Sequence, residues 1–230
     1  MAERSRRKIL HQGSLIGTML LMGCSRNTDS PNSSNNASPI GSCGESQIFD
    51  PPKEASNPEG GYPVVTTSVS TSTNTGKIGA ASRCIRSFSS SSPARIWIAL
   101  ANLGDDPITL GFGAHQPLTR YAAEHRTADF SIYVVPSRFE NEGKHHSNGN
   151  DTTSDQNFGC WKLDEWGYDS EVNNVTLDPC EIIKGTYALF ASAGNGGCLI
   201  DGTYRVDENL SGPNGQVEAS LSLSVSVDHG

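Results

Sequence analysis

The chain has 230 residues, with 17 Lys and Arg against 25 Asp and Glu, and its formal net charge is −8. We expect residues 1–23 to be a signal segment. Their removal takes away four basic residues and one acidic residue. The remaining chain has 13 basic and 24 acidic residues and a formal charge of −11. Such a surface repels nucleic acid, and no basic stripe runs along the sequence, so nucleic-acid binding is excluded.

The N-terminus has the pattern of an export signal followed by a lipid-attachment site. The run Ser5-Arg6-Arg7-Lys8-Ile9-Leu10 resembles the twin-arginine signal, and an apolar run of 11 residues follows from Gly13 to Gly23. This run is shorter than the ~20 residues of a membrane-spanning helix. Leu21-Met22-Gly23-Cys24 resembles a lipobox, in which the cysteine receives the lipid. We therefore expect a lipoprotein lipidated at Cys24, exported, and anchored on the outer face of the cell membrane. The alternative is an uncleaved helix with an incidental cysteine.

Residues 24–59 are predicted to be a flexible tether, because Ser25 to Ser42 is Ser, Asn and Pro with almost nothing apolar. Such a segment cannot bury enough surface to offset its conformational entropy. The sequence also contains sequons that are candidates for glycosylation of an exported protein, at Asn32, Asn36, Asn150, Asn174 and Asn209.

Residues 60–230 are predicted to form one all-β domain, an immunoglobulin-like Greek-key β-sandwich. Ala94 to Gly113 reads as an antiparallel hairpin, with Asn102 to Pro107 as its turn. Pro213-Asn214-Gly215 reads as a second hairpin turn. Ser137 to Gly159 is a long polar insertion that we expect to be mobile. Further alternating or β-branched runs predict strands at Val64–Thr73, Phe130–Val135, Thr186–Ala191, Thr203–Val206 and Val217–Val227.

The cysteines indicate disulfide bonds rather than a metal site, because an exported domain favours disulfides. No pair has the Cys-x-x-Cys spacing of metal ligands, and no His stands near them at ligand spacing. The five cysteines beyond Cys24 allow 15 arrangements of two bridges, from five choices of free thiol and three pairings of the rest. They are Cys43, Cys84, Cys160, Cys180 and Cys198.

Short motifs in the second half resemble an uncharacterised module of lipoproteins from salt-loving archaea. They are Gly159-Cys160-Trp161, Ile183 to Tyr187, Gly197-Cys198 and Gly202 to Arg205. The opening stretch, with Asn102 ending its first strand, is also similar to the immunoglobulin-like fold of the intracellular proteinase-inhibitor family. The resemblance implies a Cys160–Cys198 disulfide and leaves the pairing of Cys43, Cys84 and Cys180 open. It transfers no catalytic residue.

No catalytic motif occurs in the chain: there is no Gly-x-Ser-x-Gly elbow, no His-Glu-x-x-His and no phosphate-binding glycine loop. We predict no cofactor and no metal. His145-His146 reads as part of a solvated loop rather than a metal site, and Asp105-Asp106 reads as a solvated turn rather than a cation site. Among the aromatic residues, Trp161 is expected in the core, whereas Trp166 and Tyr168 are candidates for a ligand-binding platform.

Three functions of different class remain open. The first is a non-catalytic surface module that binds a protein or glycan partner or acts as a structural spacer. The second is a module similar to a protease inhibitor, which would need a rigid exposed loop; an unordered Ser137–Gly159 insertion argues against it. The third is an enzyme whose site the motifs do not show.

Overall fold

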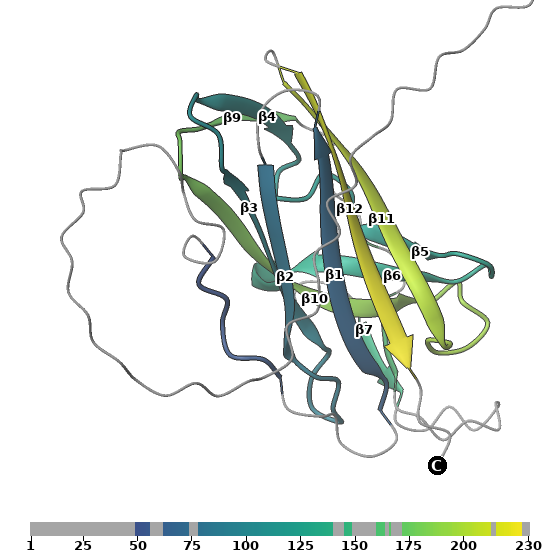
Figure 1. Ribbon diagram of the computed structural model, residues 1–230. Helices are drawn as coiled ribbons and strands as arrows, with labels where there is room; N and C mark the ends of the chain where they lie inside the picture. The colour runs from purple at the N-terminus through teal and green to yellow at the C-terminus, as the bar shows by residue number, and fades with distance from the viewer. Residues whose placement is uncertain are drawn as a thin grey trace, which may run out of the picture. The chain divides into compact units, whose positions relative to one another are not determined.

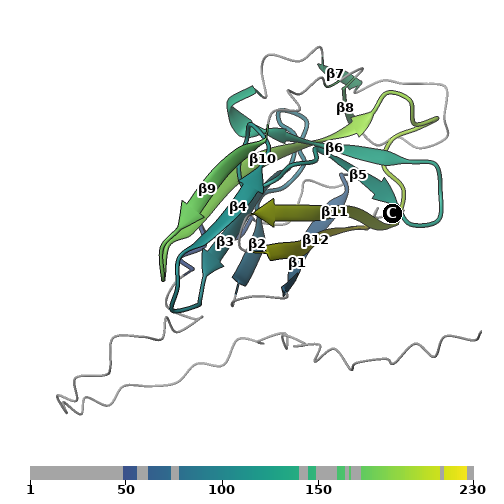
Figure 2. The same ribbon diagram turned by 90° about the horizontal axis from the view of Figure 1, so that it is seen from above.

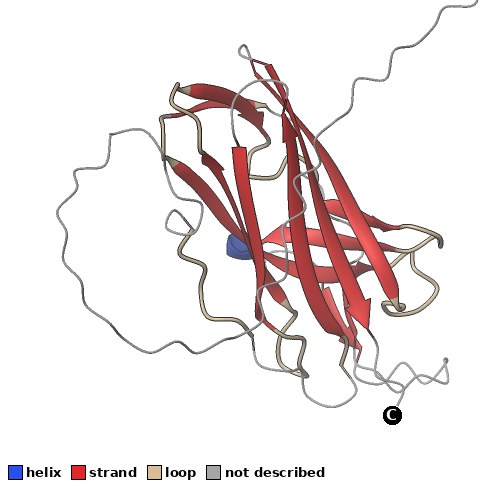
Figure 3. Ribbon diagram, in the orientation of Figure 1, coloured by secondary structure: helices blue, strands red, loops and turns tan. Residues whose placement is uncertain are grey.

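The computed structural model describes residues 49–55, 62–73, 78–139, 145–148, 160–163, 166, 172–212 and 215–226. The chain divides into two compact units, Met1–Ser38 and Pro39–Gly230, and all described residues belong to the second. The regular secondary structure of the described part is all strand (Figure 3) apart from one 3-10 turn, η1 (Ser137–Phe139). Its strands are β1 (Val64–Thr73), β2 (Ile78–Arg86), β3 (Arg95–Asn102), β4 (Ile108–Phe112), β5 (Ala122–His125), β6 (Ser131–Pro136), β7 (His145–Asn148), β8 (Cys160–Leu163), β9 (Asn173–Leu177), β10 (Ile182–Ser192), β11 (Gly202–Gly212) and β12 (Gly215–Ser226).

The strands form a large curved sheet and a small two-stranded sheet (Figures 1 and 2). The large sheet has the order β1-β12-β11-β5-β6-β10-β3-β2, with β8 pairing β10 and β7 pairing β8, while β4 pairs β9 in the small sheet. β1 and β2 stand at the two ends of this order yet contact each other, so the sheet curls around its core. The prediction of an all-β sandwich is confirmed.

The alternation of apolar residues in the last strand directs them into the core as predicted. Val217, Leu221, Leu223 and Val225 of β12 are buried, and the residues between them are more exposed. β11 and β12 pair antiparallel along their whole length, with Gly212 opposite Gly215, which confirms the hairpin predicted there. The main core cluster lies inside the curve of the large sheet and includes Ile96, Ile98, Leu189 and Tyr204.

The hairpin predicted over residues 94–113 is wrong, although both of its strands exist. β3 pairs with β10 and β2, whereas β4 pairs with β9 in the small sheet. The turn therefore carries the chain from one sheet to the other. The reason is packing: β4 places Ile108, Leu110 and Phe112 in a second core cluster that also contains Leu210 and Val217. Period-two alternation predicts a strand but not the strand with which it pairs.

Asn102 stabilises the turn that carries the chain between the two sheets. It is the last residue of β3 and is 2% exposed. Its Nδ2 donates to the carbonyls of Asp106 at 2.8 Å and Leu177 at 3.0 Å, and its Oδ1 accepts from the Gly104 N–H at 2.9 Å. One amide thus ties the end of β3 to the turn and to the end of β9.

Part of the predicted tether lies against the domain instead. The Ala55 N–H donates to the Cys84 carbonyl at 2.9 Å, and Arg83 donates to the Pro52 carbonyl at 3.1 Å. Residues 49–55 therefore run alongside β2. Within the predicted mobile insertion, η1 and β7 are ordered elements, and the other residues from 140 to 159 lie outside the described part. None of the described segments is a helix long and apolar enough to cross a bilayer.

Replacing Asn102 with Ala should lower the free energy of unfolding by about 2–3 kcal/mol, because three buried or half-buried backbone groups lose their partner. Urea denaturation of the chain followed by circular dichroism measures this loss. Asp105→Ala is the matched control, since Asp105 is exposed in the same turn and its removal should change stability by less than about 0.5 kcal/mol. Equal denaturation midpoints for the two variants would contradict this role for Asn102.

Candidate functional site

β10 has an edge that its neighbours cover only in part. β3 pairs with residues Ile182 to Ala188 on one edge, but β6 reaches the other edge only from Tyr187, opposite Pro136. The Leu189 N–H donates to the Ala94 carbonyl on the β3 side. Because main-chain groups alternate between the two edges of a strand, Lys184 and Thr186 direct theirs toward the side where β6 has already ended.

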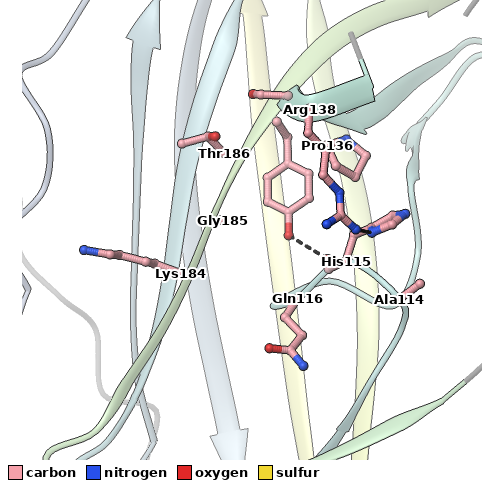
Figure 4. A pocket seen from close by; sticks show the side chains of 10 residues that line it. Ala114, His115, Gln116, Pro136, Arg138, Lys184, Gly185 and Thr186 are labelled. Carbon is pink, nitrogen blue, oxygen red and sulfur yellow. Dashed lines mark hydrogen bonds between the residues drawn. The ribbon is translucent and has the colours of Figure 1, made fainter. Parts of the chain in front are cut away.

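A cavity of about 480 Å³ lies at this uncovered edge. That volume is within the usual range for ligand sites. Three segments line it: the loop after β4, the end of β6 with η1, and the first half of β10 (Figure 4). The residues that line it are Ala114, His115, Gln116, Pro136, Ser137, Arg138, Lys184, Gly185, Thr186 and Tyr187.

Two buried tyrosines hold the loop wall of the cavity. The Tyr187 hydroxyl donates to the His115 carbonyl at 2.9 Å, and the Tyr121 hydroxyl accepts from the His115 N–H at 3.0 Å. Gly185 lets the loop come close, because a Cβ there would lie 2.6 Å from the Gln116 carbonyl oxygen. The main chain that carries His115 and Gln116 is therefore fixed against β10.

A buried carboxylate holds the other end of the same loop. Glu208 of β11 is 4% exposed and accepts through Oε1 from the Thr119 N–H at 3.1 Å and the Arg120 N–H at 2.9 Å. Its Oε2 accepts from the Thr119 hydroxyl. Burial raises the pKa of Glu208 above the ordinary carboxyl value, and the hydrogen bonds from Thr119 and Arg120 oppose that shift.

Arg138 is the cation that faces the loop wall, and His115 orients it. The Arg138 guanidinium donates to Nδ1 of His115 and lies over the Phe139 ring at 4.7 Å from its centroid. Burial, and then the charge of Arg138, lower the pKa of His115, so the imidazole accepts this bond in its neutral form. The Lys184 side chain points away from this pair in Figure 4. The site therefore presents one positioned guanidinium, that of Arg138, beside the uncovered edge of β10.

The cavity also carries an unused hydroxyl. Ser137 Oγ is buried and has no hydrogen-bond partner among the described residues. His115 is not a base for this hydroxyl, because its Nδ1 already accepts from Arg138. The guanidinium and the main-chain groups suit the binding of a polar, negatively charged ligand, whereas the buried Ser137 Oγ is not accessible to it.

The aromatic residues singled out in the sequence are not in the cavity lining. Trp161 packs against two core clusters and donates from Nε1 to the Ser89 carbonyl at 2.9 Å. Trp166 is half-buried against the same clusters, with its ring centroid 5.8 Å from that of Phe139. Tyr168 lies outside the described residues, so the platform stays a prediction. Asp105 and Asp106 are exposed in their turn.

The histidine pair and the sequons are placed only in part. His145 and His146 belong to β7, where their main chain pairs with β8. No group of three or more His, Cys, Asp or Glu able to hold a metal occurs in the described part of the chain. Asn174 and Asn209 are exposed on strands, and glycosylation there stays a prediction. The other sequons and Cys24 lie outside the described residues: Asn32, Asn36 and Asn150.

The cysteines with described side chains include both a free thiol and disulfide-bonded residues. Cys84 is free and buried, whereas Cys180 and Cys198 are disulfide-bonded. Cys180 stands just before β10 and Cys198 six residues after its end. β8, which Cys160 opens, pairs with Ala191 and Ser192 at the Cys198 end. This register favours the Cys160–Cys198 pair, which stays a prediction because the Cys160 side chain lies outside the described residues.

Sequence reasoning missed His115, Arg138 and Glu208. One signal for Glu208 was present: Tyr204, Val206 and Leu210 share its period of two and are buried, so an acid stands on an inward face. No comparable signal marked His115 and Arg138, because they come from a loop and a turn that only the fold brings together.

Replacing Glu208 with Ala should lower the free energy of unfolding by about 2–3 kcal/mol at neutral pH, because the Thr119 and Arg120 amides lose their acceptor. Glu208→Gln is the matched control, since its Oε1 can still accept from both amides while the Thr119 hydroxyl accepts from Nε2. Because the folded pKa of Glu208 is raised, proton uptake favours the folded state. Wild-type stability relative to Glu208→Gln should therefore rise as pH falls from neutral toward about 4.3.

Urea denaturation between pH 8 and pH 4.5 measures both effects. A wild-type stability that falls relative to Glu208→Gln over that range, or an Ala variant as stable as the Gln variant, would contradict the assignment.

Comparison with known proteins gives no relative on which to base a function. No protein-family model, no curated protein and no solved structure matches the chain. The function must therefore be argued from the site itself.

Proposed function

We propose that this protein is a lipid-anchored, non-catalytic surface module that binds a protein or glycan partner through the cavity at the β10 edge. The observation that carries the proposal is the Arg138–His115 pair at the mouth of a preformed cavity, in a domain whose charges are mostly acidic. A positioned guanidinium selects an anionic group on the partner. The export signal and lipobox pattern support a place on the outer face of the membrane.

The binding part of the proposal is tested with acetate, the simplest carboxylate, in an NMR titration of the soluble Cys24→Ser chain. We expect acetate to perturb His115 and raise the pKa of its imidazole, because the anion neutralises the adjacent guanidinium. Arg138→Gln should weaken acetate binding by up to about fivefold, since an exposed charge pair contributes up to ~1 kcal/mol.

Arg126→Gln is the matched control, because it removes the same charge at an exposed position outside the cavity lining. Acetate affinity should not change in this variant. If Arg138→Gln binds acetate as tightly as the wild-type chain, or if His115 does not respond to acetate, the cavity is not the binding site.

The anchor is tested by replacing the lipidation residue. Cys24→Ser should release the chain from the membrane fraction or leave the signal segment attached, because only the cysteine can carry the thioether-linked lipid. Ser25→Ala, one residue later, leaves Cys24 in place and should remain membrane-bound. Membrane extraction and intact mass show the outcome. Equal extraction and equal processing for the two variants would refute the lipid anchor.

A further inference from the structure

We infer that the cavity takes the C-terminal end of an extended peptide, which adds as a short strand to the uncovered edge of β10 and places its terminal carboxylate on Arg138. This inference rests on the proposed function and names the partner class for the same site. Three features of the site support it: the free edge of β10, the point at which β6 closes that edge, and the charge at that point.

The free edge supplies the pairing groups. Lys184 and Thr186 direct main-chain N–H and C=O groups toward the cavity, and no described residue is their ladder partner on the β6 side. An uncovered edge of this kind is a template for an added strand. A saccharide could use single hydrogen bonds here, but only a peptide backbone matches the alternating donors and acceptors of a strand edge.

The end of β6 limits how far an added strand can run. Pro136 pairs with Tyr187, and the chain then turns away through η1, so β6 occupies the edge from Tyr187 onward. A peptide lying along Ile182 to Thr186 therefore meets β6 and must end or turn at that point. Ser137 and Arg138 line the cavity where this happens, and Figure 4 shows Arg138 beside Pro136.

The charge at the closed end decides the direction of the peptide. An antiparallel strand would bring its N-terminal ammonium toward Arg138, and the two cations would repel each other. A parallel strand brings a C-terminal carboxylate there, where the guanidinium can donate two hydrogen bonds. The geometry thus points to a parallel strand with a free C-terminus.

The probe is the acetylated hexapeptide Thr-Val-Thr-Val-Thr-Val with a free carboxylate, added to the Cys24→Ser chain in a nitrogen-15 NMR titration. We expect the largest shifts at the amides of Lys184 and Thr186. The C-terminally amidated peptide should bind about tenfold more weakly, because it lacks the charge-assisted hydrogen bonds to Arg138. In Arg138→Gln the acid and the amide should bind equally, whereas Arg126→Gln should keep the difference.

The backbone pairing is tested by N-methylation, which removes peptide donors without altering the protein. Methylation of alternate residues in one register should abolish binding, and methylation in the other register should leave it within about twofold, because only one set of N–H groups faces β10. Equal effects of the two registers, equal affinity of acid and amide peptides, or unchanged Lys184 and Thr186 amides would overturn the inference.

A glucuronic acid tetramer separates failure of this inference from failure of the proposed function. If the tetramer binds in an Arg138-dependent manner and the peptide does not, the partner is an acidic glycan: the proposed function stands and the peptide inference is overturned. If acetate, tetramer and peptide all leave His115, Lys184 and Thr186 unperturbed, both the proposed function and the inference fail.

Discussion

The cavity depends on an offset between the two neighbours of β10. β3 covers β10 from Ile182 to Ala188, while β6 covers the opposite edge from Tyr187 to Ala191. If β6 were three residues longer, Lys184 and Thr186 would have ladder partners and the cavity would be filled by main chain. Because β6 stops at Pro136, the described strands cover one side of β10 along its first half and leave the other side open there. The edge that results is short, which limits the pairing it offers to other proteins.

The loop beside this edge of β10 is held by a buried carboxylate, that of Glu208, although burying a carboxylate is unfavourable. The loop between β4 and β5 has no sheet partner for the amides of Thr119 and Arg120, and unpaired buried amides are expensive. Glu208 supplies both acceptor positions from the neighbouring strand. Together with the tyrosine bonds to His115, it fixes the loop at both ends. A fixed loop loses little entropy on binding, so a weak ligand contact is not further weakened by ordering the site.

Sequence patterns predicted the strands well and their neighbours poorly. Val217 to Val225 alternate without a break, so β12 and its hairpin partner followed from local signals. The residues of β3 and β4 alternate as regularly, yet the two strands belong to different sheets, because alternation sets which face is buried and does not set the strand with which each one pairs. The residues of the cavity were harder to predict from the sequence than the strand neighbours. His115 and Arg138 are 23 residues apart and meet only because β5 and β6 return the chain to the same end of β10.

Different groups in the cavity would provide affinity and selectivity: the main chain of β10 the first, and Arg138 the second. Arg138 is exposed, and an exposed charge pair contributes only about 1 kcal/mol, less as the salt concentration rises. Main-chain hydrogen bonds between neutral groups are not screened in this way. In an acidic protein, long-range repulsion of an anionic partner falls with salt, while the strand-edge contacts persist. The open edge of β10 would therefore supply most of the binding free energy, and the positioned guanidinium would decide which chain end is accepted.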